Sequence, residues 1–214
     1  LVELGAEQWA ARANKAFVPP KPLPDSRTCM TMHQPWASLM VQGYKRAEGR
    51  VWTPRPPFTG RLWIHAGGKV PEPETVLAVE AQYKALLLAA GVPEEEIQLP
   101  PVYPTGMLIG SVDIPAVLPN AVYRSALVGQ VPPSVLAESS APYVFLCQNP
   151  QVLLEPIAMP GSFKLWRLPN KVWHQAREGC EPASPPEPVA FPPSVATLGP
   201  QASAGAASEP HSKT

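Results

Sequence analysis

The chain has 214 residues, 31 of them proline, and its 17 basic and 17 acidic side chains give a formal net charge of zero. Its longest apolar stretch, residues 85–90, is far below the ~20 residues that a membrane-spanning helix needs. The three cysteines are an odd number without the spacing of a zinc site, which argues against a disulfide framework and a structural metal. We therefore expect an intracellular protein with no membrane segment, metal or cofactor.

Proline-rich segments mark the ends of one predicted domain. Residues 18–24 suit an extended linker, because proline fixes φ and lacks an N–H group. After residue 180 proline, alanine and serine accumulate, and large apolar side chains become too rare to bury much surface. We predict an N-terminal segment and linker over residues 1–26, weakly helical at 2–16, one domain over 27–180 and a disordered tail over 181–214.

The zero net charge hides a segregation of charge along the chain. Residues 27–70 carry seven basic residues against one acidic residue, and residues 156–180 carry four against one. Residues 71–155 reverse the balance, with nine acidic residues against two basic ones. If the two basic segments meet in the fold, they form a positive face that attracts phosphate. A patchwork surface without a function is the alternative.

The first predicted core elements are a strand over residues 27–32 and a short helix that follows it. Pro35 suits the first turn of this helix, and Gly43 suits the left-handed position just beyond its end. The strand therefore delivers His33 and Gln34 to the start of the helix.

The next predicted strand, residues 61–66, alternates between two faces. One face is apolar and suits the core. The other face carries Arg61, Trp63 and His65, and so combines cations with an aromatic ring.

The rest of the predicted domain contains one long helix and three more strands. Apolar residues recur at helical spacing over residues 73–90, and Gly91 follows the end of this pattern. Short apolar runs rich in β-formers predict strands at 107–114, 143–147 and 162–168. This pattern favours an α+β fold, a small β-barrel of five or six short strands with two or three helices.

Several motifs occur in the order and spacing of a known domain. They are His33-Gln-Pro-Trp-Ala-Ser, Gly43-x-Lys45-x-x-Glu48-x-Arg50, Gly60-Arg-Leu-Trp-Ile-His65, Tyr103-Pro-Thr-Gly-Met-Leu-Ile-Gly-Ser-Val-Asp113 and Pro142-Tyr-Val-Phe-Leu-Cys-Gln-Asn-Pro150. In these motifs the chain resembles the ASCH domain family, from about residue 27 to about residue 179.

The resemblance implies a PUA-like β-barrel with a groove beside the first helix. It implies RNA or DNA as the binding partner, with subunits of a cointegrator complex as protein partners, in the nucleus or the cytoplasm. It also implies a non-catalytic role in transcription coactivation or in RNA and ribosome quality control.

The side chains in these motifs suggest how nucleic acid would be held. Lys45 suits a phosphate contact and the planar fork of Arg50 suits a base edge. Glu48 can accept a hydrogen bond from the amino group of a splayed base. His33 and Gln34 lie at a helix start, where free N–H groups favour an anion. The alternative for the charged trio is a salt-bridged cluster that only closes the barrel.

Four further residues complete the predicted interface: Arg61, Trp63, His65 and Lys164. Trp63 could stack on a base, although a tryptophan more often belongs to a core. By their spacing we assign three other aromatic side chains to the core: Trp36, Tyr83 and Trp166.

An enzymatic alternative also follows from the resemblance. Some small bacterial ASCH proteins hydrolyse the amide of N4-acetylcytidine with a lysine, a threonine and a glutamate. Lys45 matches the lysine, and Glu48 stands where that pattern has the threonine. Catalysis would need a depressed lysine pKa, whereas a neighbouring carboxylate favours the charged form. We therefore expect nucleic-acid binding rather than hydrolysis. If the protein were a hydrolase, Lys45 and Glu48 would be its catalytic residues.

Overall fold

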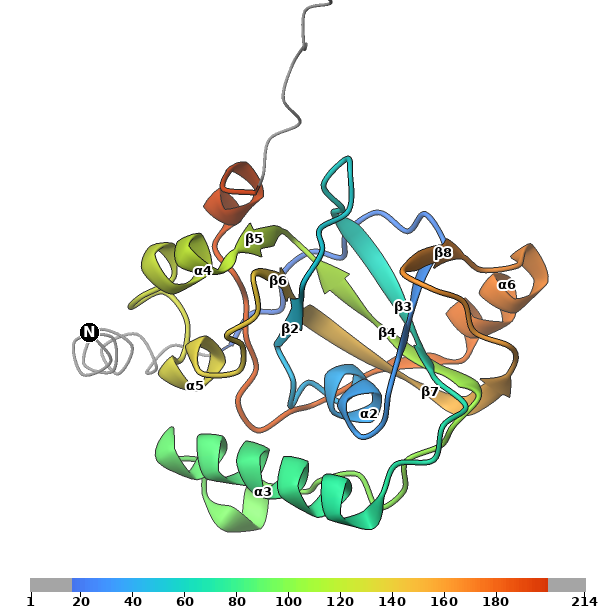
Figure 1. The fold of residues 1–214 in the computed structure, drawn as a ribbon, viewed down its shortest axis with the longest axis horizontal. Helices are drawn as coiled ribbons and strands as arrows, with labels where there is room; N and C mark the ends of the chain where they lie inside the picture. Colours follow the sequence, from blue (N-terminus) through green and yellow to red (C-terminus); the bar gives the residue numbers. More distant parts are fainter. Residues whose placement is uncertain (1–16, 200–214) are drawn as a thin grey trace, which may run out of the picture.

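The computed structural model describes residues 17–199, which form two β-sheets with helices packed around them (Figure 1). The α+β class predicted from the sequence is confirmed. The weak helix predicted at residues 2–16 and the end of the predicted tail, residues 200–214, lie outside the described residues.

The larger sheet has six strands in the order β8-β1-β3-β4-β7-β9. Strand β1 runs parallel to β3, and the other neighbours are antiparallel. Its strands are β1 (Thr28–Met32), β3 (Gly60–Ala66), β4 (Met107–Ile114), β7 (Gln148–Ala158), β8 (Leu165–Arg167) and β9 (Cys180–Pro182). Because β8 and β9 stand at opposite edges, this sheet is open, in contrast to the closed barrel that we predicted.

The smaller sheet is antiparallel and has the order β2-β6-β5. Its strands are β2 (Ala47–Arg50), β6 (Tyr143–Leu146) and β5 (Val117–Pro119). The chain thus leaves the larger sheet after β1, contributes β2 to the smaller sheet, and returns to the larger sheet with β3.

Five α-helices lie around the sheets within residues 17–199: α2 (Trp36–Val41), α3 (Pro73–Ala89), α4 (Asn120–Ala126), α5 (Pro133–Leu136) and α6 (Asn170–Glu178). Helices α4 and α5 lie beside the smaller sheet, and α6 lies at the β8 side of the larger sheet (Figure 1). Helix α3 packs against α2 through Tyr83 and Leu39. The helix predicted at residues 73–90 is confirmed by α3.

The larger sheet is buried on both faces. On one face Met30, Leu62 and Val112 join Phe145 of the smaller sheet in the main core. On the other face Trp63 packs in a second apolar cluster with residues of α6. The alternation of β3 therefore separates two cores, and neither face of that strand is the exposed cationic face that we predicted.

The predicted disorder is wrong for residues 181–199. Three of their large apolar side chains, Val189, Phe191 and Val195, are buried against α4, α5 and the smaller sheet. A 3₁₀ turn, Pro193–Thr197, ends this part of the chain. An extended proline-rich segment can still fold onto a domain when a few large side chains are spaced so that they enter the domain's core.

The proline-rich residues before β1 also pack on the domain. The Pro24 carbonyl accepts a hydrogen bond from the Arg61 N–H at 2.8 Å. The Asp25 carboxylate accepts hydrogen bonds from the indole N–H groups of Trp63 and Trp173. These contacts hold residues 17–26 along the larger sheet.

Candidate nucleic-acid interface

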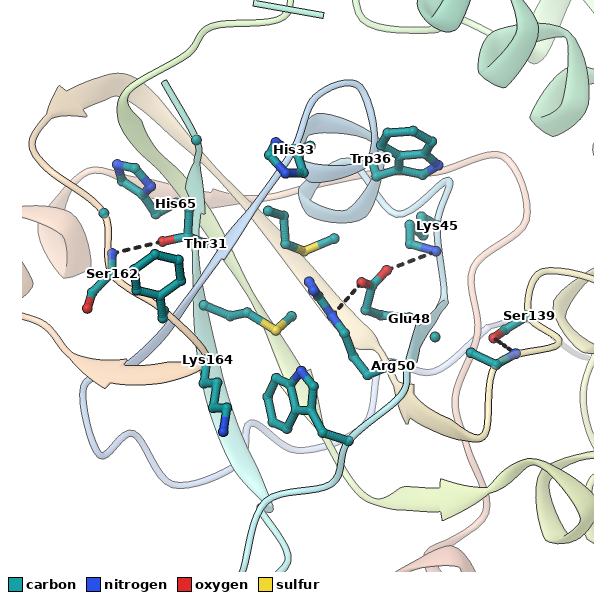
Figure 2. Close-up of a pocket in the computed structure, with 18 of the residues that line it drawn as sticks. Thr31, His33, Trp36, Lys45, Glu48, Arg50, His65, Ser139, Ser162 and Lys164 are labelled. Atoms are coloured by element: carbon teal, nitrogen blue, oxygen red, sulfur yellow. Dashed lines mark hydrogen bonds and ion pairs between the residues drawn. The ribbon is translucent and has the colours of Figure 1, made fainter. Parts of the chain in front are cut away.

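A cleft of about 980 Å³ opens between the end of β1 and strand β2 (Figure 2). Five separate segments of the chain line it: residues 30–36, residues 45–52, residues 65–68, residues 138–141 and residues 161–164. Its volume is at the upper end of the roughly 300 to 1,000 Å³ that is typical of ligand sites.

The short helix α2 positions the charged side of the cleft. It ends before Gly43, whose φ of +81° turns the chain sharply. The N–H groups of Tyr44 and Lys45 then donate to the Leu39 carbonyl at 2.9 and 3.0 Å. A side chain at Gly43 would also lie 2.7 Å from Pro185, so the turn needs glycine for its conformation and for its packing. The turn at Gly43 therefore fixes the position of Lys45 relative to the end of α2.

Lys45, Glu48 and Arg50 form a linked cluster at this side of the cleft (Figure 2). One Glu48 oxygen lies 3.1 Å from Lys45 Nζ, and the other lies 2.9 Å from Arg50 Nε. Lys45 and Glu48 are only 5% and 8% exposed. The side chain of Arg50 is 27% exposed, so it is the member of the cluster that solvent reaches most readily. Glu48 and Arg50 stand two residues apart on β2, and the alternation of a strand places both side chains on one face.

Lys45 is held as an ammonium ion. Burial by itself lowers its pKa, but the negative charges of its surroundings, Glu48 first, raise that pKa above the ordinary value of 10.5. The Lys45 ammonium also donates to the Ala47 carbonyl at 2.7 Å and to the Tyr83 hydroxyl at 3.3 Å. Two cations thus surround one carboxylate, and the cluster keeps one net positive charge.

Three more predicted residues also line the cleft: His33, His65 and Lys164. His33 and Lys164 are exposed. His65 is buried, and its Nε2–H donates to the Met159 carbonyl at 2.9 Å. His65 therefore holds the loop after β7 instead of facing solvent.

The other three predicted residues lie elsewhere. The Gln34 side chain bonds the Ser38 N–H, the Ser38 hydroxyl and the Pro104 carbonyl, and so fixes the start of α2. Arg61 pairs with Asp113 at 3.0 Å. Trp63 is fully buried and offers no ring face to a base.

Within residues 17–199, no group of three or more histidine, cysteine, aspartate or glutamate side chains is placed to hold a metal ion. No helix in the same part of the chain is long and apolar enough to cross a bilayer.

Comparison with known proteins decides the family. A sequence model of the ASCH domain matches residues 30–156, more than half of the chain. The chain therefore belongs to the ASCH domain family. This match covers the end of β1, strands β2 to β6, most of β7 and helices α2 to α5, and thus the Lys45–Glu48–Arg50 cluster.

Activating signal cointegrator 1 from Homo sapiens is 37% identical to this ASCH protein over 155 residues, which are 72% of this chain and 24% of the relative. The protein of the same name from Mus musculus has the same identity and coverage. The chain thus corresponds to about a quarter of the length of these relatives.

Two solved ASCH structures from Zymomonas mobilis are more distant. The crystal structure of ASCH has 15% identity and a TM-score of 0.41, and covers 72% of this chain and 95% of its own. A mutant of the Zymomonas mobilis protein with a tyrosine replaced by phenylalanine has 16% identity and a TM-score of 0.40, and covers 72% of this chain and 98% of its own.

The two basic segments of this ASCH domain do meet, because β1 pairs with both β3 and β8. Several cations are neutralised, however. Arg46 is buried and pairs with Glu138 and Glu187. Arg61 and Lys45 also pair with carboxylates. The positive charge at the mouth of the ASCH cleft is therefore that of Arg50 and Lys164, fewer cations than the sequence count suggests.

Sequence reasoning missed the aromatic lining of the ASCH cleft. Trp36, which we assigned to the core, is half-buried and lines the cleft, as does Trp52. Phe163 lines it from the opposite segment and is 93% exposed. Trp52 and Phe163 stand in irregular segments, where no periodicity indicates which way a side chain points.

Proposed function

We propose that this ASCH domain binds RNA or DNA in the cleft and acts without catalysis. The observation that carries this proposal is the Lys45–Glu48–Arg50 cluster, placed at one side of an open cleft that aromatic rings line. Cations attract the phosphate backbone, and aromatic rings accept unstacked bases.

Arg50 supplies the directional part of this recognition. Its Nε lies 2.9 Å from a Glu48 oxygen, and although the Nε–H makes no hydrogen bond within residues 17–199, this ion pair holds the guanidinium group beside the cleft. Its two Nη groups remain as donors for a phosphate or a base edge. Because the Arg50 side chain is only partly exposed, a nucleic-acid contact there is better shielded from water than a contact at an exposed lysine. Its electrostatic attraction is therefore stronger.

Glu48 retains acceptor capacity although both of its oxygens face cations. Each carboxylate oxygen has two lone-pair sites. An amino group of a base that enters the cleft can therefore donate to Glu48 without displacing Lys45 or Arg50. This combination would favour a base with an exocyclic amino group over one without it.

The likeness to activating signal cointegrator 1 supports a place for this ASCH domain in transcription coactivation, with subunits of a cointegrator complex as partners. A related proposed role is RNA and ribosome quality control. Either role places the protein in the nucleus or the cytoplasm. The match covers a quarter of those relatives. Within such an assembly we assign the nucleic-acid contact to this domain.

Hydrolysis of N4-acetylcytidine is disfavoured by the state of Lys45. A lysine that attacks an amide or removes a proton must lose its own proton first. Here the Glu48 carboxylate at 3.1 Å raises the pKa of Lys45 and keeps the amine charged.

The experiment that tests the proposal is a salt titration of binding to single-stranded RNA, single-stranded DNA and duplex DNA. Arg50→Gln and Lys164→Gln are each expected to weaken binding and to reduce the salt slope by about 0.7 to 0.9. Lys171→Gln is the matched control, because it removes the same charge from the exposed surface of α6. Equal losses in all three variants would show that binding depends on overall charge and not on the cleft.

The same preparations should be incubated with N4-acetylcytidine. Turnover by the unmodified protein that is lost in Lys45→Met would replace the binding proposal by a hydrolase. Binding without turnover would support the proposal.

A further inference from the structure

Phe163 is the most exposed of the large apolar side chains within residues 17–199, at 93% of its surface. It stands in the loop between β7 and β8 and lines the cleft together with Lys164. This loop follows the ASCH match, which ends at residue 156. The phenyl ring gains almost nothing from burial on folding, and it presents an open aromatic face at the mouth of the cleft.

The loop is anchored on both sides of the ring. The Thr31 hydroxyl oxygen accepts hydrogen bonds from the Ser162 N–H at 3.2 Å and from the Trp166 indole N–H at 3.3 Å (Figure 2 shows the first). The Met159 carbonyl accepts from His65, and the Met159 N–H donates to the Gly106 carbonyl at 3.1 Å. These bonds fix the loop on β1 and β3, so the exposure of Phe163 is built into the fold.

Gly161 shows how closely the loop fits. A side chain there would lie 2.6 Å from His65 Nδ1 and 2.7 Å from the Thr31 hydroxyl. The backbone can approach β1 and β3 this closely only with glycine. The next residues then turn outward, and Lys164 takes a left-handed φ of +55° at the base of β8.

The charges around the ring match a nucleic-acid strand. Lys164 follows Phe163 directly and is exposed, and Arg50 lies on the β2 side of the same cleft. A ring and two cations within one cleft fit one base and its flanking phosphates. In a duplex the base faces are already covered by their neighbours, so the ring has an open face to meet only in a single strand or at an unpaired end.

We propose that Phe163 is the base-stacking platform of this cleft, and that its ligand is a single-stranded segment or unpaired end of RNA or DNA. The base lies on the Phe163 ring, and its flanking phosphates lie at Lys164 and Arg50. This inference rests on the proposed nucleic-acid binding and names the class of nucleic acid.

The test compares Phe163→Ala, Phe163→Tyr and Leu154→Ala at one salt concentration. Leu154 on β7 is the matched control, because it is another exposed large apolar side chain and does not line the cleft. Phe163→Ala is expected to weaken binding of single strands by about 5- to 150-fold, the effect of losing one stacked base. Phe163→Tyr keeps an aromatic ring and should bind like the unmodified protein, and Leu154→Ala should also leave binding unchanged.

A spectroscopic signal separates stacking from a general loss of binding. A single strand that carries 2-aminopurine should lose fluorescence when its base stacks on the Phe163 ring. At saturating Phe163→Ala protein this loss should be absent, and the salt slope should stay that of the unmodified protein, because no cation has been removed.

The outcomes distinguish this inference from the function on which it rests. No binding of any nucleic acid by the unmodified protein would refute the proposed function. Binding that Phe163→Ala leaves within twofold, or that falls equally for single strands and duplex, would overturn the stacking platform and leave the proposed function standing.

Discussion

The buried ion network at Arg46 should carry a large share of the stability of this domain. The Arg46 guanidinium group pairs with Glu138 at 2.7 Å and also with Glu187, and it donates to Ser134 at 3.1 Å. The Glu138 side chain is 0% exposed and also accepts the N–H groups of Arg46 and Ala47. Arg46→Met would leave the Glu138 carboxylate buried without its cation. We expect a loss of about 3 to 5 kcal/mol in the free energy of unfolding.

Urea unfolding followed by circular dichroism measures this loss. With an m-value of about 2 kcal/mol per molar urea, the midpoint should fall by about 1.5 to 2.5 M. Lys84→Met is the control, because it breaks an exposed pair whose side chains are 43% and 68% exposed, and it should cost at most about 1 kcal/mol. Equal midpoints for Arg46→Met and the unmodified protein would refute the argument that the pair is strongly coupled.

Three further predictions concern the cleft and the thiols. Because folding raises the pKa of Lys45, its contribution to stability is complete below pH 10.5 and is lost as the pH rises through the higher native value. NMR of Lys45 Nζ should therefore show no titration of the amine below pH 10.5. Glu48→Gln should lower the pH at which the Lys45 amine titrates. Gly161→Ala should force the loop off His65 and destabilise the protein by about 1 to 3 kcal/mol in urea unfolding, and an unchanged midpoint would contradict the close fit. Burial raises the pKa of Cys147 far above 9.0, so iodoacetamide at pH 8 should modify it only after unfolding, as mass spectrometry can show; labelling of the native protein would contradict its burial.

The parts of the fold with strong local signals could be predicted from the sequence. Pro35 and Gly43 bracket α2, and the apolar periodicity of α3 gives its length. Strand β7 was missed because Pro150 and Pro156 interrupt its alternation, and the structure accommodates them at shifts of register in a long strand. Whether a sheet closes into a barrel depends on contacts between its two edge strands. Local sequence patterns do not encode these contacts, so the open sheet could not be predicted.

The charged cluster could be predicted because three of its determinants are close in sequence. Lys45, Glu48 and Arg50 lie within one turn and one short strand, so their proximity follows from local geometry. Trp63 could not be assigned correctly, since its burial depends on α6, which packs on the second face of the sheet. Phe163 could not be assigned either, because its exposure depends on hydrogen bonds between the loop and Thr31.

The layout of the cleft sets the order in which it can be built during synthesis. Its charged side comes from the first third of the chain, whereas Phe163 and Lys164 come much later, and Glu187 closes the Arg46 network later still. Synthesis proceeds from the N-terminus, and a ribosome extends a chain at about 5 to 20 residues per second. A nascent chain that has emerged only to β6 therefore presents Arg46 without Glu187, and its cleft still lacks the segment with Phe163 and Lys164. The nucleic-acid binding that we propose needs the complete cleft, so it can begin only after almost the whole domain has left the ribosome.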